Sequence, residues 1–297
     1  MSLKKSKSAA LEKIFDAVNY TALFLLFLLC IYPFYYIFIY SISNPTLAQK
    51  GIVLLPVGIT VENYIQMIKL RGIPLAALIS VLRTVGGTLL TVFCSTLFGY
   101  IVTKDKLPFR KLMYRMMVIS MYFNAGLIPY YLTMKLYHLN NSFLLYIVPT
   151  AIVAFNVILI KTYIEQLPAA LEESARIDGA RYFTIFIKII FPLSMPIVAT
   201  VAVFSAVNQW NSWFDNYLLV QDRNLRTLQL ILYDYLNQSS VLSHLSDNDK
   251  NRGLGIVMTP QSIRMTITMI VTLPIIFVYP FMQKYFVKGI MLGAIKG

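Results

Sequence analysis

Long apolar stretches separated by short charged stretches run through most of this chain. A transmembrane helix requires about 20 consecutive, mostly apolar residues. Several stretches meet this requirement, and no charged residue lies between Arg115 and Lys135. We therefore expect an all-α integral membrane protein with six transmembrane helices, at about Tyr20–Ser41, Pro74–Val102, Met116–Met134, Ser142–Ile160, Pro192–Phe214 and Met265–Gln283.

The composition supports a membrane protein, since 58% of the residues are hydrophobic and 13% are charged. A soluble domain typically carries about twice that charged fraction. The net charge of +13 would also fit a nucleic-acid-binding protein, but basic residues of membrane proteins concentrate in cytoplasmic loops, so we set that class aside. Cys30 and Cys94 lie in apolar stretches, which predicts core thiols, and no zinc-ligand spacing is present, so we expect no metal site.

Basic residues concentrate on one side of the six-span arrangement. They lie in the N-terminus, in the connections 2–3 and 4–5, and in the C-terminal tail. Because Lys and Arg favour cytoplasmic loops, this side is predicted to be cytoplasmic, with both termini inside. The residues are Lys4, Lys5, Lys7, Lys13, Lys104, Lys106, Arg110, Lys111, Lys161, Arg176, Arg181, Lys188, Lys284, Lys288 and Lys296.

The N-terminal segment has an apolar stripe, formed by Leu11, Phe15 and Val18 at helical spacing. Such a stripe predicts a cytoplasmic amphipathic helix that lies on the inner membrane surface. We find no repeat and no second domain. The expected parts of a single domain 1–297 are the N-terminal segment 1–19, a six-span core 20–286 with a cytoplasmic loop 161–192, and a cytoplasmic tail 287–297.

Two longer loops are predicted on the outer side, at 44–73 and at about 215–260. The second ends in the polar stretch 243–255, "SHLSDNDKNRGLG", which we expect to be mobile. His138 and His244 fall in or near outer loops and are interpreted as ordinary surface groups.

The connection between spans 4 and 5 contains an unusually charged stretch for this chain, "EESARIDGARYFTIFIKIIFP". It begins with good helix formers, and Glu172 and Arg176 form an i, i+4 pair in the favourable order. Gly179 stands where a helix would end, because glycine adopts the left-handed conformation at little cost. A second short helix then leads to Pro192. The pattern predicts two short helices at an angle.

This pair of helices has the features of a docking element. The small residues Ser174, Ala175 and Ala180 lie near the predicted bend and would allow another protein to approach closely. Glu173 and Asp178 offer negative charge to basic partners. From these features alone, a surface helical hairpin without a partner is an equally good interpretation.

The spacing of the stretch is more specific. It contains E-S-A at 173–175, then three residues and Gly179, then nine residues and I-I-F-P at 189–192. This resembles the EAA loop of ABC importer permeases, whose pattern is E-A-A-x3-G-x9-I-x-L-P. The chain departs from that pattern at Ser174 and Phe191.

The resemblance extends over most of the chain, through "ENY" at 62–64, "GLIPYYL" at 126–132, "QWNSWFDNYLLV" at 209–220 and the ending at 283–297. These segments are similar to the second, maltose-type permease of oligosaccharide importers. The ending and the last outer loop are similar to a branch associated with complex or plant-derived oligosaccharides.

The resemblance implies a non-catalytic permease subunit in the bacterial plasma (inner) membrane. It implies a second homologous permease, an extracellular or periplasmic solute-binding protein, and two ATPases that bind ATP and Mg and dock on residues 168–192. This chain itself has no G-x-x-x-x-G-K-[ST] phosphate loop and would bind no cofactor. By the resemblance, Glu173 would pair with a basic residue of the ATPase. The residues assigned to coupling are Glu172, Glu173, Ser174, Ala175, Asp178, Gly179, Ala180 and Pro192.

A sugar pathway needs amide, carboxylate and aromatic groups, because sugars present hydroxyls and flat apolar C–H faces. Polar residues within the bilayer usually face the bundle interior or a water-filled pathway, and Gly126 and Pro129 predict a break in span 3. The candidate pathway residues are Tyr122, Asn124, Tyr130, Asn208, Trp210, Asn211, Trp213 and Asp215.

Structural explanations compete with each of these assignments. The tryptophans and tyrosines are also typical of the aromatic belt at the membrane interface, and the asparagines of hydrogen bonds between helices. We interpret Arg83, within span 2, as snorkelling or paired rather than as a sugar ligand.

Other function classes fit less well. A secondary transporter would favour a carboxylate or histidine within a span, and the cores of spans 1, 3, 4, 5 and 6 lack one. A membrane enzyme would need a nucleophile, a metal cluster or an acid–base pair, and neither H-E-x-x-H nor G-x-S-x-G occurs. An ABC importer permease for another polar solute remains the main alternative.

Overall fold

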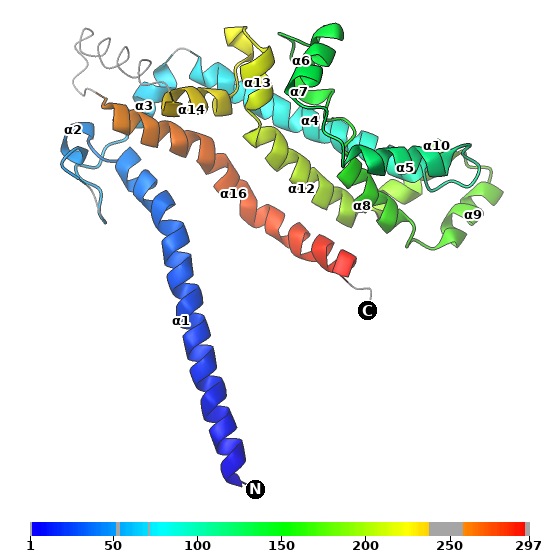
Figure 1. The fold of residues 1–297 in the computed structure, drawn as a ribbon, viewed down its shortest axis with the longest axis horizontal. Helices are drawn as coiled ribbons and strands as arrows, with labels where there is room; N and C mark the ends of the chain where they lie inside the picture. Colours follow the sequence, from blue (N-terminus) through cyan, green and yellow to red (C-terminus); the bar gives the residue numbers. More distant parts are fainter. Residues whose placement is uncertain (1, 52–53, 71, 238–257, 295–297) are drawn as a thin grey trace. The chain divides into compact units, whose positions relative to one another are not determined.

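The computed structural model describes residues 2–51, 54–70, 72–237 and 258–294 (Figure 1). Helices joined by turns and loops make up this part of the chain, and the single backbone bridge within it joins Ser43 to Ile59. The predicted mobile stretch 243–255, with His244, lies outside the described residues. Two compact units make up the chain, Met1–Leu70 with Tyr235–Ile270, and Arg71–Asp234 with Val271–Gly297.

The first unit is built on one long helix. α1 runs from Ser2 to Ser41, and its exposed side chains between 12 and 35 are largely apolar, as contact with lipid requires. No glycine interrupts this helix, and its first proline is Pro33. The predicted amphipathic segment therefore continues into the first span without a break, since nothing in the sequence interrupts the helix between them.

Short elements pack at the C-terminal end of α1. They are α2 (Pro45–Ala48), α3 (Glu62–Lys69) and the first part of α16 (Pro260–Ala294). The side-chain amide of Asn63 donates hydrogen bonds to the carbonyls of Ser41 and Ser43, at 2.8 and 2.9 Å. Carbonyls at a helix end have no partner within the helix, so this buried amide stabilises the end of α1.

The second unit holds three packed helices, α4 (Ile73–Ile101), α8 (Ala154–Ile164) and α12 (Met195–Asn211). Its main core lies between them and includes Tyr100, Ile160, Phe186 and Val201. The other elements are α5 (Arg110–Ser120), α6 (Leu127–Leu136), α7 (Leu144–Ile147), α9 (Ala169–Ile177), α10 (Tyr182–Ile185), the π-helix η1 (Phe186–Ile190), α11 (Phe191–Leu193), α13 (Phe214–Leu219), the 3-10 helix η2 (Arg223–Leu225) and α14 (Leu228–Asn237).

Within the described residues, three helices are long and apolar enough to cross a membrane, Glu12–Ser41, Ile73–Ile101 and Pro260–Pro280. They correspond to predicted spans 1, 2 and 6. A fourth crossing is possible through the pair Tyr182–Leu193 and Met195–Asn211, which meet at an angle of 82°. The count of six spans stays a prediction.

The predicted break in span 3 is confirmed, whereas predicted span 4 is wrong as a single helix. Span 3 breaks between α5 and α6 at Gly126, whose φ is +83° and whose N–H donates to Asn124 Oδ1 at 2.9 Å. Span 4 breaks between α7 and α8 next to Pro149, because proline lacks the N–H that the helix needs and disfavours helical backbone before it. The carbonyl of Thr150 is satisfied by the Thr91 hydroxyl instead, at 2.7 Å.

Two neighbouring glycines on α4 provide a test of the packing between α4 and α12. A Cβ at Gly87 would lie 2.3 Å from Gln209 Nε2, whereas a Cβ at Gly86 would meet only Ile147 Cγ2, at 3.9 Å. Both changes to alanine gain about 1 kcal/mol of helix propensity. We expect Gly86→Ala to unfold at or above the wild-type temperature. Gly87→Ala should lose about 1–3 kcal/mol, because it displaces a buried, hydrogen-bonded amide.

Thermal unfolding of the two purified variants in detergent measures this difference directly. Equal unfolding temperatures for Gly86→Ala and Gly87→Ala would show that Gln209 moves aside without cost.

Candidate functional site

A buried arginine is the centre of the polar structure in the second unit. Arg83, on α4, is 2% exposed. Its Nε donates to Gln209 Oε1 at 3.0 Å, and its two terminal nitrogens bind both carboxylate oxygens of Asp215, with 3.1 Å from Nη1 to Oδ1. Nη1 also donates to the Ser212 carbonyl at 3.2 Å. Arg83 is thus paired, as one of the two sequence interpretations held, in the two-bond geometry that suits guanidinium and carboxylate.

Further hydrogen bonds join this pair to the surrounding elements. Gln209 Nε2 donates to the Tyr146 carbonyl at 3.1 Å and to Thr150 Oγ1 at 2.7 Å. The Tyr146 ring lies 4.5 Å from the Arg83 guanidinium, and its hydroxyl accepts from Asn216 Nδ2 at 2.7 Å. We call this set the Arg83 network: Arg83, Tyr146, Thr150, Gln209, Asp215 and Asn216. It fixes α4, α7, α12 and α13 to one another.

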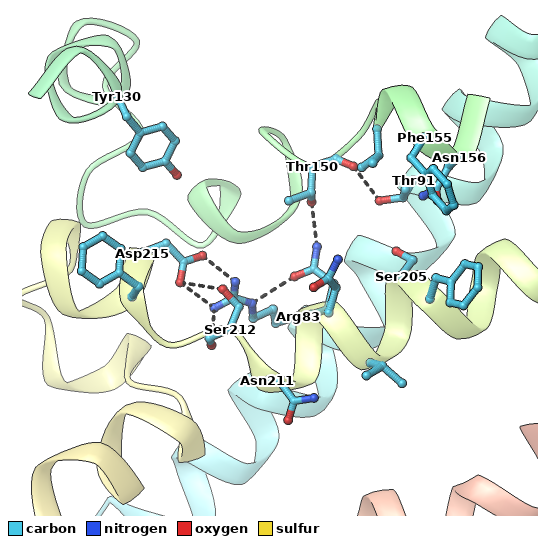
Figure 2. A pocket seen from close by; sticks show the side chains of 16 residues that line it. Arg83, Thr91, Tyr130, Thr150, Phe155, Asn156, Ser205, Asn211, Ser212 and Asp215 are labelled. Atoms are coloured by element: carbon cyan, nitrogen blue, oxygen red, sulfur yellow. Dashed lines mark hydrogen bonds and ion pairs between the residues drawn. The ribbon is translucent and has the colours of Figure 1, made fainter. Parts of the chain in front are cut away.

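A cavity of about 850 Å³ borders the Arg83 network (Figure 2). This volume lies in the range typical of small-molecule sites, about 300–1,000 Å³. Hydroxyl and amide groups face it together with aromatic rings. Beyond the network residues, the polar lining residues are Thr91, Asn156, Ser205, Asn208, Asn211 and Ser212, and the aromatic ones are Tyr130, Phe155, Phe204 and Phe214.

The cavity has no net charge among the described residues that line it, since Arg83 and Asp215 are the charged ones and they neutralise each other. The Asp215 carboxylate also accepts from the Asn216 N–H at 2.8 Å and from the Ser212 hydroxyl at 3.3 Å. Its Oδ1 therefore accepts from three donors of the chain, and its Oδ2 accepts from the Arg83 guanidinium. Such a lining favours an uncharged polar ligand with flat apolar faces.

The structure brings half of the predicted pathway residues to this cavity: Tyr130, Asn208, Asn211 and Asp215. Tyr130 comes from α6 and the others from α12 and the segment that follows it (Figure 2). Sequence reasoning missed Asn156. As an isolated amide within an apolar stretch, it carried the same signal as Asn124.

The other predicted pathway residues do not line the cavity. Tyr122 is 85% exposed, and Asn124 accepts the hydrogen bond that closes the turn before α6. Trp210 Nε1 donates to the Val271 carbonyl at 3.1 Å. The Trp213 ring stacks on Tyr233, with 4.1 Å between ring centroids. Both tryptophans therefore make contacts within this unit, Trp210 through a hydrogen bond and Trp213 through ring stacking.

The predicted coupling residues lie on and around α9, which Figure 1 shows next to α8 and α10. α9 ends before Gly179, whose φ is +79°. The Ala180 N–H donates to the Ala175 carbonyl at 2.9 Å and the Gly179 N–H to the Arg176 carbonyl at 3.0 Å. These two bonds form a Schellman motif, which requires the left-handed backbone that glycine supplies. Pro192 lies in α11, just before the 82° bend.

The side chains around α9 divide into two groups. Ala175 and Ala180 pack against the core cluster of their own chain. Glu172 is largely shielded from solvent and binds Lys104 Nζ, at 2.6 Å from Oε2, with Arg176 Nη2 3.4 Å from the same oxygen. Burial lowers the pKa of the Lys104 ammonium below its ordinary value, and the hydrogen bond and charge of Glu172 oppose that shift.

The second group faces outward. Glu173, Ser174 and Asp178 are exposed, and within the described residues Glu173 has no ion-pair partner. Ile177 is 86% exposed, which is unusual for an isoleucine beside a cluster of charges. The sequence analysis did not include Ile177 among the coupling residues, although an isoleucine between the charged residues Arg176 and Asp178 is a signal of an exposed apolar side chain. The exposed side chains of α9 and its C-terminal end therefore combine carboxylates with the apolar side chain of Ile177.

The described residues contain no group of three or more His, Cys, Asp or Glu side chains that could hold a metal ion. Cys30 and Cys94 are free thiols, located in α1 and α4.

Comparison with known proteins places these features in a family. Residues 1–292 match the family model described as "Binding-protein-dependent transport system inner membrane component". The chain is 34% identical over 287 residues to the polygalacturonan/rhamnogalacturonan transport system permease protein YtcP of Bacillus subtilis (strain 168), covering 96% of this chain and 99% of that one. It is 35% identical over 286 residues to protein LplC of the same organism, covering 96% of each.

A solved structure agrees with these relatives. One chain of a bacterial ABC transporter involved in the import of the acidic polysaccharide alginate is similar to this chain, with a TM-score of 0.86 and 29% identity, covering 93% of this chain and 97% of that one. The matches run over nearly the whole length of the chain and of its relatives. The chain therefore belongs to the family of inner membrane components of binding-protein-dependent transport systems.

Proposed function

We propose that this chain is one of two permease subunits of an ABC importer and that its cavity forms part of the path of an oligosaccharide. The cavity beside the Arg83 network carries this proposal, because it combines amides, hydroxyls and aromatic rings in a unit built on membrane-spanning helices. Amides and hydroxyls exchange hydrogen bonds with sugar hydroxyls, and aromatic rings pack against the C–H faces of a pyranose.

The substrate class is supported by the relatives. One is named for polygalacturonan and rhamnogalacturonan and another transporter for alginate, all of them polysaccharides. In this chain the cavity is neutral, so we assign to it the uncharged hydroxyl and C–H faces of the sugar rather than a carboxylate. Another polar solute of similar size is the alternative.

We propose the following assembly around the chain. Six spans with both termini cytoplasmic place residues 168–192 on the inner side, where they dock on an ATPase. Two ATPases bind ATP and Mg, and this chain remains non-catalytic. A second, homologous permease completes the pathway, and an extracellular solute-binding protein meets the outer loops 44–73 and 215–260. The complex lies in a bacterial plasma membrane.

The outward face of α9 supports docking on the ATPase. Among the described residues no cation pairs with Glu173 or Asp178, so both carboxylates are offered to a partner, and Ile177 offers an apolar side chain to a pocket. Breaking one side of a shielded ion pair across an interface costs about 2–5 kcal/mol, so Glu173 is the residue whose loss should weaken docking most.

Docking is tested by purification of the complex in mild detergent. We expect wild-type protein to bring down an ATPase and a second permease, and the double variant Glu173→Ala with Gly179→Trp to retain the permease but lose the ATPase. Glu165→Ala, which removes an exposed carboxylate directly after α8, serves as the control and should behave as wild type. Absence of any ATPase from the wild-type preparation would contradict the importer assignment and favour a secondary transporter.

The role of the Arg83–Asp215 pair is tested by neutralising one or both partners. Asp215→Asn leaves a buried guanidinium without its counter-charge and should lower the free energy of unfolding by about 3–5 kcal/mol. The double variant Arg83→Gln with Asp215→Asn should recover most of that loss and still transport an uncharged oligosaccharide.

Unfolding in detergent and uptake by reconstituted complexes measure the two effects. If Asp215→Asn unfolds like the wild type but transports nothing, Asp215 contacts the substrate directly and the assignment of a neutral cavity is wrong.

A further inference from the structure

An ion pair attaches the coupling segment, residues 168–192, to the loop that directly follows α4. Lys104 follows α4 by three residues, and its ammonium binds the Glu172 carboxylate of α9, at 2.6 Å from Oε2. The same ammonium lies 3.9 Å from the centroid of the Tyr100 ring. The side chains of Lys104 and Glu172 are 14% and 15% exposed, so water screens this pair less than it screens a surface pair.

The loop that carries Lys104 is itself held in place. The Lys104 N–H donates to the Ile101 carbonyl at 3.1 Å, and Arg110 Nη1 donates to the Thr103 carbonyl at 3.1 Å. Arg110 also forms an ion pair with Asp105. Lys104 is therefore a fixed extension of α4 and not a side chain on a long, loose connection.

A second contact joins the same two parts of the chain. Phe186, in the π-helix η1, is fully buried, and its ring lies 5.5 Å from Tyr100 and 6.3 Å from Phe93, both on α4. Ala175 and Ala180, on either side of the Schellman turn, pack against this cluster. Apolar contacts of this kind hold the segment close, whereas the ion pair with Lys104 fixes the direction of α9.

α4 connects this attachment to the cavity. The helix is unbroken over 29 residues, a length of roughly 43 Å at 1.5 Å per residue. It carries Tyr100 near one end and Arg83 beside the cavity, and Gly87 lets the Gln209 amide approach it closely. The direct connection from the coupling segment to α12 instead passes through the 82° bend at Ser194.

We infer that Lys104 and Glu172 are positioning residues, which transmit displacement of the coupling segment to α4 and through α4 to the cavity. The inference rests on the proposed function. It assigns different roles to two adjacent carboxylates. Glu172 holds α9 to its own chain, whereas Glu173 remains available to the ATPase. Loss of the pair should leave docking intact and reduce the amount of sugar moved per ATP hydrolysed.

The test uses the complete transporter reconstituted in liposomes, with the variants Lys104→Met, Glu172→Gln and both together. We expect each single variant to keep its bound ATPase and to lower the ratio of sugar transported to ATP hydrolysed about fivefold or more. The double variant should be no worse than the singles, since the two residues act as one pair. Lys104→Arg, which keeps the charge, should restore most of the ratio.

The matched control is Lys161→Met. Lys161 also pairs with a glutamate, Glu165 at 2.7 Å, and lies 4.6 Å from the ring of Tyr114, but Glu165 caps the end of α8 and is not part of α9. We expect this variant to keep the wild-type ratio.

The outcomes separate the inference from the function on which it rests. A wild-type ratio in Lys104→Met, with ATPase bound, would overturn the inference alone. Equal loss of transport and of bound ATPase would also overturn it, because the pair would then serve docking. If the wild-type chain binds no ATPase at all, the proposed function fails, and the inference fails with it.

Discussion

A guanidinium buried in an apolar helix needs a counter-charge within reach, and in this protein that constraint ties Arg83 to Asp215. The two residues are far apart in the sequence, and their contact fixes the start of α13 against α4. Gln209 accepts a hydrogen bond from Arg83 Nε and donates one to the Tyr146 carbonyl, and the Arg83 guanidinium lies over the Tyr146 ring. Because an unpaired buried charge is so costly, the elements that carry these residues have little freedom to separate.

The same ion pair sets the chemistry of the cavity beside it. With both charges neutralised within the chain, the lining presents amides, hydroxyls and aromatic rings. This suits the parts of a sugar that carry no charge, and it would leave recognition of any sugar carboxylate to groups outside this cavity. α4 therefore contributes to two sites. It carries Arg83 beside the cavity, and it carries Tyr100, whose ring contacts Phe186 of the coupling segment.

Several of these structural features could be predicted from the sequence. The motif around Gly179 predicted a helix end there, and Gly179 does adopt a left-handed backbone with a Schellman turn. Breaks within the predicted transmembrane helices were harder to predict. Gly126 and Pro129 signalled one in span 3, but the run 142–160 looked like an ordinary span, since a single proline within a long apolar run is compatible with a kinked helix as well as with a break.

The all-helical membrane architecture, the longest helices and the family follow from the amino-acid sequence, because they depend on local hydrophobic length and on motif spacing along the chain. Which polar residues meet depends on the packing of helices that are distant in the sequence. This packing placed Asn208 and Asn211 at the cavity and Trp213 on Tyr233, and it turned Glu172 inward while leaving Glu173 exposed. The physical reason is that burial and pairing of a polar side chain depend on distant helices, which neither propensity nor spacing encodes.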